Sequence, residues 1–200
     1  MTFEQFLLGR LEGFVSLTPA QAEALREHYE LLAHWNTRIN LTAIRSMEEA
    51  VLRHYCESLF LVAKIDARPG SIIFDLGSGG GFPGIPLAIL RPDWRLTLIE
   101  SHQRKAVFLR EATRSLRNAT VIDQRAEGVN GRCDWLVSRA VRPPEVLTQV
   151  KRLSRNVGVL IGEADLKECL QDEAIHWNDP IKLPWGERRY VLTGNVPRGT

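Results

Sequence analysis

The fold is decided by the stretch Phe74-Asp75-Leu76-Gly77-Ser78-Gly79-Gly80-Gly81-Phe82-Pro83-Gly84-Ile85-Pro86. The short apolar run Ser71-Ile-Ile precedes it, and a helical pattern follows as far as Arg91-Pro92-Asp93. Glycines between a strand and a helix let the backbone turn sharply and let a ligand approach without a Cβ in the way. Ligands in parallel α/β sheets bind at the carboxyl ends of the strands. This stretch therefore predicts a ligand site, with Gly77, Ser78 and Gly79 in the loop that holds the ligand.

Beyond this loop, strand-sized apolar segments alternate with segments of helical periodicity. Alternation at these lengths predicts an α/β fold with a doubly wound, mostly parallel sheet. In the tail, residues 181–183 and 189–192 predict an antiparallel hairpin at the sheet edge. The expected strands cover residues 96–100, 119–123, 134–138 and 157–161, and the expected helices cover residues 103–116, 144–153 and 165–175.

The region before the loop has helical patterning. Thr18-Pro19 is typical of a helix N-cap followed by proline at the first helical position. A further helix is expected to start near Met47, because acidic residues suit its first turn. The sequence thus predicts two parts, an N-terminal helical extension at residues 1–70 and a ligand-binding α/β domain at residues 71–200.

Composition narrows the class of protein. The chain has 200 residues, of which 44% are hydrophobic and 25% charged, with a formal net charge of +2. These values are typical of a globular protein and do not exclude nucleic-acid binding, which depends on where the charges lie. No apolar run approaches the ~20 residues that span a bilayer, and the N-terminus has no signal-peptide pattern. We therefore expect a cytoplasmic protein without membrane association.

The cysteines do not form a pattern that binds metal. Cys56, Cys133 and Cys169 are far apart, odd in number and without CxxC spacing. The expected state is three reduced, buried thiols, as is usual in the cytoplasm. We predict no metal site.

Three cofactor classes use a glycine loop in this position. A phosphate-binding P-loop is excluded because no Gly-Lys-Ser/Thr occurs here. A dinucleotide site stays open, since Glu100 ends the second strand and could bind a ribose diol. Asp75 favours S-adenosylmethionine instead, because a carboxylate beside the loop repels a pyrophosphate and attracts an ammonium or sulfonium. Glu100 would then accept from the ribose hydroxyls, and Glu127 would lie near the adenine edge.

With these motifs the chain resembles the RsmG (GidB) family, bacterial methyltransferases that modify a 16S rRNA guanine at N7. The likeness covers almost the whole chain. It implies a class I S-adenosylmethionine-dependent methyltransferase with a Rossmann-like sheet. The matching pieces are His34-Trp35-Asn36, Asn40-Leu41-Thr42, Arg53-His54 before Ser58, the loop from Asp75 to Pro86, Glu100-Ser101, Arg104-Lys105, Phe108-Leu109, Arg125-Ala126-Glu127, Ser138-Arg139-Ala140 and Glu187-Arg188-Arg189.

The resemblance also implies roles for single residues. Cofactor contacts would fall on Gly77, Phe82, Ala126, Glu127 and Arg139. Arg139, at the carboxyl end of its strand, is our candidate catalytic residue, facing the cofactor or the target base. A structural salt bridge to Asp75 or Glu100 is the competing role for this arginine.

Basic residues near these motifs are the candidates for RNA contact. They are Arg53, His54, Arg104, Lys105 and Arg142. For His54 the alternative is packing inside the fold. The implied partner is 16S rRNA or the small ribosomal subunit, bound by a monomer.

One position departs from the family pattern. Many members carry Lys-Gly on the fifth strand, where this chain has Ile161-Gly162. A lysine there would contact RNA, so its loss bears on RNA binding more than on the cofactor site. This departure leaves one alternative to an active rRNA methyltransferase, an S-adenosylmethionine-binding ribosome-assembly factor with weak or lost activity. A second alternative, a dinucleotide-dependent oxidoreductase, rests on the glycine loop and Glu100, and Asp75 argues against it.

Overall fold

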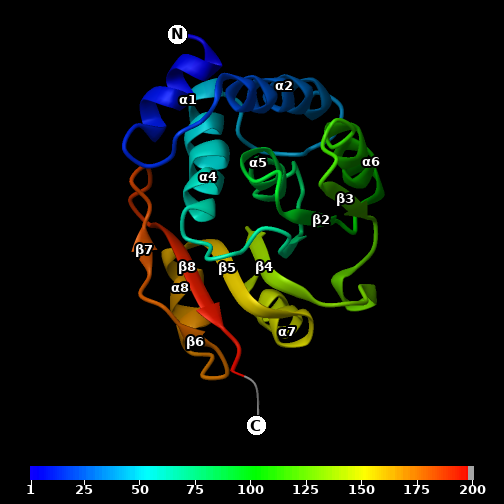
Figure 1. The fold of residues 1–200 in the computed structure, drawn as a ribbon, viewed down its shortest axis with the longest axis vertical. Coiled ribbons are helices and arrows are strands. Elements are labelled where there is room, and N and C mark those ends of the chain that lie inside the picture. Colours follow the sequence, from blue (N-terminus) through cyan, green and yellow to red (C-terminus); the bar gives the residue numbers. More distant parts are fainter. Residues whose placement is uncertain (198–200) are drawn as a thin grey trace.

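The computed structural model describes residues 1–197 and centres on one twisted sheet (Figure 1). Residues 198–200, the last of the predicted ligand-binding domain, lie outside the described residues. The strand order is β3-β2-β1-β4-β5-β8-β6, with β7 paired to β8. The strands are β1 (Ile72–Leu76), β2 (Arg95–Ile99), β3 (Ala119–Ile122), β4 (Cys133–Arg139), β5 (Ser154–Gly162), β6 (His176–Trp177), β7 (Ile181–Lys182) and β8 (Arg189–Asn195).

The pairing confirms the doubly wound arrangement. Strands β1 to β5 pair in parallel, with β1 between β2 and β4. The predicted hairpin is present, since β7 pairs antiparallel with β8. It lies at the sheet edge as predicted, because β8 pairs antiparallel with β5 on one side and only the two-residue strands β6 and β7 pair with its other side. The start of β8 therefore lies at the carboxyl ends of the parallel strands.

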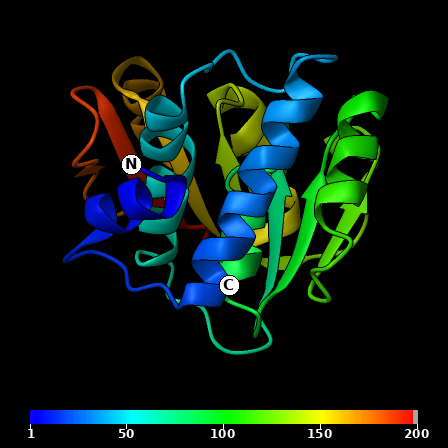
Figure 2. The same cartoon turned by 90° about the horizontal axis from the view of Figure 1, so that it is seen from above.

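Helices cover both faces of the sheet (Figures 1 and 2). One face carries α5, α6 and the N-terminal helices, and the other carries α7 and α8. Their bounds are α1 (Phe3–Leu11), α2 (Pro19–Asn36), α3 (Met47–Ala50), the π-helical η1 (Val51–Cys56), α4 (Glu57–Val62), α5 (Gly84–Leu90), α6 (Gln103–Ala112), the short 3₁₀ turn η2 (Ala126–Gly128), α7 (Pro143–Leu153) and α8 (Glu163–Leu170).

Strand alternation separates two cores. Ile73 and Leu98 face the N-terminal helices, whereas Phe74 and Ile99 face α7 and α8. Successive side chains of a strand point to opposite faces, so each buried strand supplies both cores. The first core also contains residues of α1, α2 and α4. The N-terminal extension is therefore a layer of this core, and the division into residues 1–70 and 71–200 stays a prediction.

Most element boundaries follow local chemistry. Thr18 caps α2 through a capping box with Gln21, as Thr18-Pro19 predicts. Residues 47–62 form one continuous helical segment that widens to π geometry at η1. Helix α8 ends at Leu170 and not near residue 175, because the Asp172 carboxylate accepts from the Ala174 N–H and turns the chain.

Candidate functional site

The glycine loop leaves β1 and enters α5 in the order that the sequence predicts. Gly77, Gly79 and Gly81 have φ values of 69°, 54° and 89°. These values lie in the left-handed region that residues with a Cβ rarely adopt. A Cβ on Gly77 would lie 2.5 Å from Cγ2 of Val141. The loop therefore needs glycine at position 77 for its conformation and for space.

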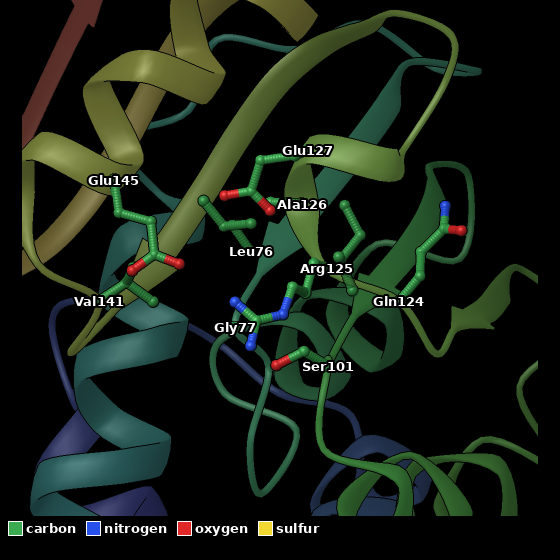
Figure 3. Close-up of a pocket in the computed structure, with 10 residues that line it drawn as sticks. Leu76, Gly77, Ser101, Gln124, Arg125, Ala126, Glu127, Val141 and Glu145 are labelled. Carbon is green, nitrogen blue, oxygen red and sulfur yellow. The ribbon is translucent and has the colours of Figure 1, made fainter.

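A pocket opens beside this loop, at the carboxyl ends of β1 and β2 (Figure 3). It encloses about 410 Å³ of empty space, part of which is open solvent at its mouth. In Figure 3 the side chains of Arg125, Glu127 and Glu145 turn toward this space. The lining residues are Leu76, Gly77, Ile99, Ser101, Gln124, Arg125, Ala126, Glu127, Val141 and Glu145.

The pocket brings together three of the predicted cofactor residues, Gly77, Ala126 and Glu127. Sequence reasoning missed Arg125 and Glu145 as lining residues. Both follow strands that end at this edge, β3 and β4, so their place in the topology was the available signal. The carboxylates of Glu127 and Glu145 outnumber the one guanidinium in the lining, which favours a cationic ligand.

Asp75 lies beneath the loop and does not face the pocket as expected. It is 0% exposed, and its Oδ2 accepts from the Gly84 N–H at 2.9 Å. Burial raises its pKa to about 7, and its Oδ1 has no hydrogen-bond partner among the described residues. The Ser78 hydroxyl donates to the Asp75 carbonyl at 3.0 Å. Asp75 and Ser78 thus fasten the loop from below.

Glu100 fastens the loop from the side. Its Oε2 accepts from the Gly79 N–H at 2.9 Å and its Oε1 from the His102 N–H at 2.8 Å. The residue is 7% exposed. Both oxygens therefore bind backbone in this structure, and the contact of Glu100 with ribose hydroxyls stays a prediction.

Phe82 and His54 stack inside the fold, with ring centroids 4.4 Å apart. Each residue is 4% exposed. The His54 Nε2 bonds to the Thr42 hydroxyl at 2.8 Å, and burial together with Arg139 lowers the His54 pKa to about 2. The prediction that His54 contacts RNA is therefore wrong. Its neutral ring packs inside the fold, as the alternative for this residue stated.

A second buried histidine holds the loop, and the sequence did not reveal it. His28 Nε2 lies 3.1 Å from the Gly80 carbonyl, and His28 Nδ1 lies 2.9 Å from the Tyr55 hydroxyl. A carbonyl only accepts, so Nε2 carries the proton and Nδ1 accepts from Tyr55. Burial lowers the His28 pKa to about 4, which keeps the ring neutral. The helical extension thereby reaches the glycine loop.

Arg139 pairs with Glu57, a partner that the sequence did not indicate. Its Nε donates to Glu57 Oε2 at 3.4 Å, and the Arg139 side chain is 13% exposed. Glu57 also binds Arg189, through contacts of 2.6 and 3.1 Å. The next residue, Ala140, has a φ of 61°, an unusual value for a residue with a Cβ. The salt bridge expected as the competing role thus exists, but to Glu57 and not to Asp75 or Glu100.

The remaining candidates for RNA contact lie at the surface. Arg104 and Arg142 are exposed, and Lys105 is half-buried. The side chain of Arg53 is 47% exposed and lies 3.5 Å from the Glu49 carboxylate. Their contact with RNA stays a prediction.

The pocket and loop fit S-adenosylmethionine better than a phosphate ligand. The loop has no lysine, and carboxylates line the pocket. The side chains of Val141 and Ile85 fill the space that a Cβ on Gly77 or Gly81 would need. Residues 1–197 contain no cluster of three or more His, Cys, Asp or Glu that could hold a metal ion. The three cysteines are free and buried. Across the same residues, no helix has the length and hydropathy to cross a membrane.

The fold and the site define a class I methyltransferase. A solved structure of an S-adenosylmethionine-dependent methyltransferase from Aquifex aeolicus superposes with a TM-score of 0.61 at 13% identity, covering 74% of this chain and 93% of that chain. Fibrillarin from Aeropyrum pernix, solved with natively bound S-adenosyl-L-methionine, superposes with a TM-score of 0.52 at 17% identity, covering 65% of this chain and 70% of that chain. At these identities the likeness concerns the fold.

Sequence comparison gives the family. The model of the GidB family, described as rRNA small subunit methyltransferase G, matches residues 21–176. A protein named ribosomal RNA small subunit methyltransferase G from Pelotomaculum thermopropionicum is 34% identical over 197 residues, covering 94% of this chain and 82% of the relative. A protein of the same name from Burkholderia ambifaria is 40% identical over 183 residues, covering 87% of this chain and 77% of the relative. The chain belongs to the GidB family.

Proposed function

We propose that this protein transfers a methyl group from S-adenosylmethionine to N7 of a guanine in 16S ribosomal RNA. Family membership makes it a methyltransferase of small-subunit rRNA that uses S-adenosylmethionine. The observation that carries the proposal is the pocket in which Gly77, Ala126 and Glu127 meet at the end of β1. Nothing in this arrangement favours a dinucleotide-dependent oxidoreductase.

The chain's own residues would hold the cofactor in three ways. Gly77 leaves room for it at the end of β1, where the adjacent Val141 also lines the pocket. Ala126 and Glu127 form the wall at the end of β3. The carboxylates of Glu127 and Glu145 supply negative charge near a cationic ligand. Asp75, Glu100 and His28 keep the loop in place.

The chemistry requires little acid–base work from the protein. S-adenosylmethionine, when bound, supplies a methyl group on a sulfonium, which a lone pair attacks in line. Guanine N7 carries such a lone pair and no proton, so no general base is needed. The protein's contribution is then positioning of the base and exclusion of water. This agrees with the pocket, because neither buried histidine, His28 nor His54, is among the residues that line it.

The partner is 16S rRNA, alone or in the small subunit, bound by a monomer in the cytoplasm. Arg53, Arg104, Lys105 and Arg142 are the proposed RNA contacts. The family lysine position contributes nothing to RNA here, because Ile161 is 5% exposed and packs in the core beneath α7 and α8. RNA binding then depends on the surface cations, whose phosphate contacts weaken with salt.

The test is transfer of label from S-adenosylmethionine to small subunits that lack the modification. The proposal predicts label in 16S rRNA, with transfer that approaches one methyl group per subunit. Cofactor binding without label would favour the alternative, an assembly factor with weak or lost activity. Thermal stabilisation by NAD but not by S-adenosylmethionine would contradict the cofactor assignment.

A further inference from the structure

One buried carboxylate is shared by two arginines from different parts of the fold. Glu57 begins α4 and its side chain is 3% exposed. Arg189, at the start of β8, donates to both Glu57 oxygens, Nε to Oε1 at 3.1 Å and Nη2 to Oε2 at 2.6 Å. Arg139, at the end of β4, reaches only Oε2, through Nε at 3.4 Å. The better contact thus belongs to Arg189.

Because Arg139 contacts Glu57 only through Nε, the edge formed by its two terminal nitrogens stays available. Within residues 1–197 its two terminal nitrogens make no hydrogen bond, and neither is among the fully buried unpartnered atoms. A guanidinium edge with two parallel N–H groups matches a carboxylate or a phosphate. The cluster also holds two cations against one anion, so a further anion would balance it.

Arg139 lies on the face of the sheet against which Phe82 of the glycine loop packs. Val137 packs in the core under the N-terminal helices, and strand alternation places Arg139 on the same face. His54 lies close enough for the charge of Arg139 to lower its pKa, and the His54 ring stacks on Phe82 of the glycine loop. Arg139 therefore lies beside the loop that we propose holds the cofactor.

We propose that Arg189 is a positioning residue, which holds Glu57 in a two-bond contact and so keeps the terminal nitrogens of Arg139 available for an oxyanion. Without Arg189, the Glu57 carboxylate is free to close on Arg139 and occupy that edge. The inference rests on the proposed function, which supplies two oxyanions of this chemistry. One is the carboxylate of the cofactor's amino-acid end, and the other is a phosphodiester of the RNA.

The experiment compares Arg189→Gln with the unaltered chain in calorimetric binding. S-adenosylhomocysteine carries the carboxylate, whereas 5′-methylthioadenosine lacks the amino-acid portion. If the oxyanion is the cofactor carboxylate, Arg189→Gln weakens S-adenosylhomocysteine binding at least about tenfold and leaves methylthioadenosine binding unchanged. If it is the phosphodiester, both ligands bind as before. The slope of log affinity for 16S rRNA against log salt concentration then falls by about the value of one phosphate contact.

Two further variants separate positioning from damage to the fold. The double change Glu57→Gln with Arg189→Gln removes the carboxylate that would capture Arg139, so it restores most of the lost binding. Should Arg189→Gln fail to fold, Arg189→Lys replaces it, because it keeps the charge and loses the two-bond contact, with a smaller loss expected. Arg188→Gln is the matched control, since Arg188 has an 82% exposed side chain and lies 3.8 Å from Glu163.

The inference is overturned if Arg189→Gln changes neither ligand discrimination nor the salt dependence of RNA binding. It is also overturned if the double variant binds no better than Arg189→Gln. Failure of the proposed function looks different, because the unaltered chain would then bind neither S-adenosylhomocysteine nor 16S rRNA.

Discussion

Replacing Asp75 by asparagine tests the buried carboxyl beneath the glycine loop. Burial raises the pKa of Asp75 from 3.8 to about 7, so the native state prefers the protonated form. Between pH 3.8 and about pH 7 the native chain holds a proton on Asp75 that the unfolded chain has released. Stability contributed by the carboxyl is therefore present below about pH 4 and is lost as pH rises toward 7. The full difference corresponds to about 4 kcal/mol, as an order of magnitude.

Asparagine at position 75 keeps an oxygen that can accept from the Gly84 N–H and has no ionisation. Its NH₂ group would stand where Oδ1 has no partner, which costs about 1–3 kcal/mol at every pH. The informative quantity is therefore the change with pH and not the absolute stability. From pH 5 to pH 8 the free energy of unfolding of the unaltered chain should fall by about 2–3 kcal/mol relative to Asp75→Asn.

Urea unfolding of both proteins at several pH values measures this difference. Asp179→Asn, at an exposed aspartate, is the control and should follow the unaltered chain. Parallel stability profiles for Asp75→Asn and the unaltered chain would refute the reasoning, because they would show that Asp75 keeps an ordinary pKa in the folded state.

Two other substitutions test how the loop is held and why it needs glycine. Tyr55→Phe leaves His28 Nδ1 buried without its donor, so urea unfolding should show a loss of about 1–3 kcal/mol, and a loss under 0.5 kcal/mol would contradict the bond. Gly77→Ala forces a Cβ to within 2.5 Å of Val141 and should weaken S-adenosylmethionine binding at least about tenfold in calorimetry. Gly13→Ala has the same type of backbone strain at φ 80° but meets open space, so it should cost about 1 kcal/mol of stability and leave binding unaltered.

Local patterns were sufficient to predict the sheet and the loop. The stretch from Asp75 to Pro86 is a strand, a glycine loop and a helix start, each set by residues within a few positions. Burial on both faces makes parallel strands read as short apolar runs, which is why β1, β2 and β5 were found. The edge hairpin was found too, but the antiparallel pairing of β8 with β5 was not, since it joins distant residues that no local pattern relates.

The side-chain partners in the site could not be predicted in the same way. Glu57 and Arg189 are separated by 132 positions, and Tyr55 and His28 by 27. Neither contact follows from the helical periodicity of its own segment. For Asp75 the sequence predicts the position at the strand end but not the direction of the side chain. Strand alternation turns the carboxyl under the loop, where it accepts from the Gly84 N–H. Sequence position therefore located the acids near the glycine loop, and packing decided what each oxygen binds.

The identity of the methylated product tests the central claim most directly. Small subunits that lack the modification would be incubated with the protein and labelled S-adenosylmethionine, and their 16S rRNA digested to nucleosides. The account predicts that the label co-elutes with 7-methylguanosine, because guanine N7 can be methylated without a general base. Label in a ribose-methylated nucleoside, or in a base methylated at another atom, would contradict it.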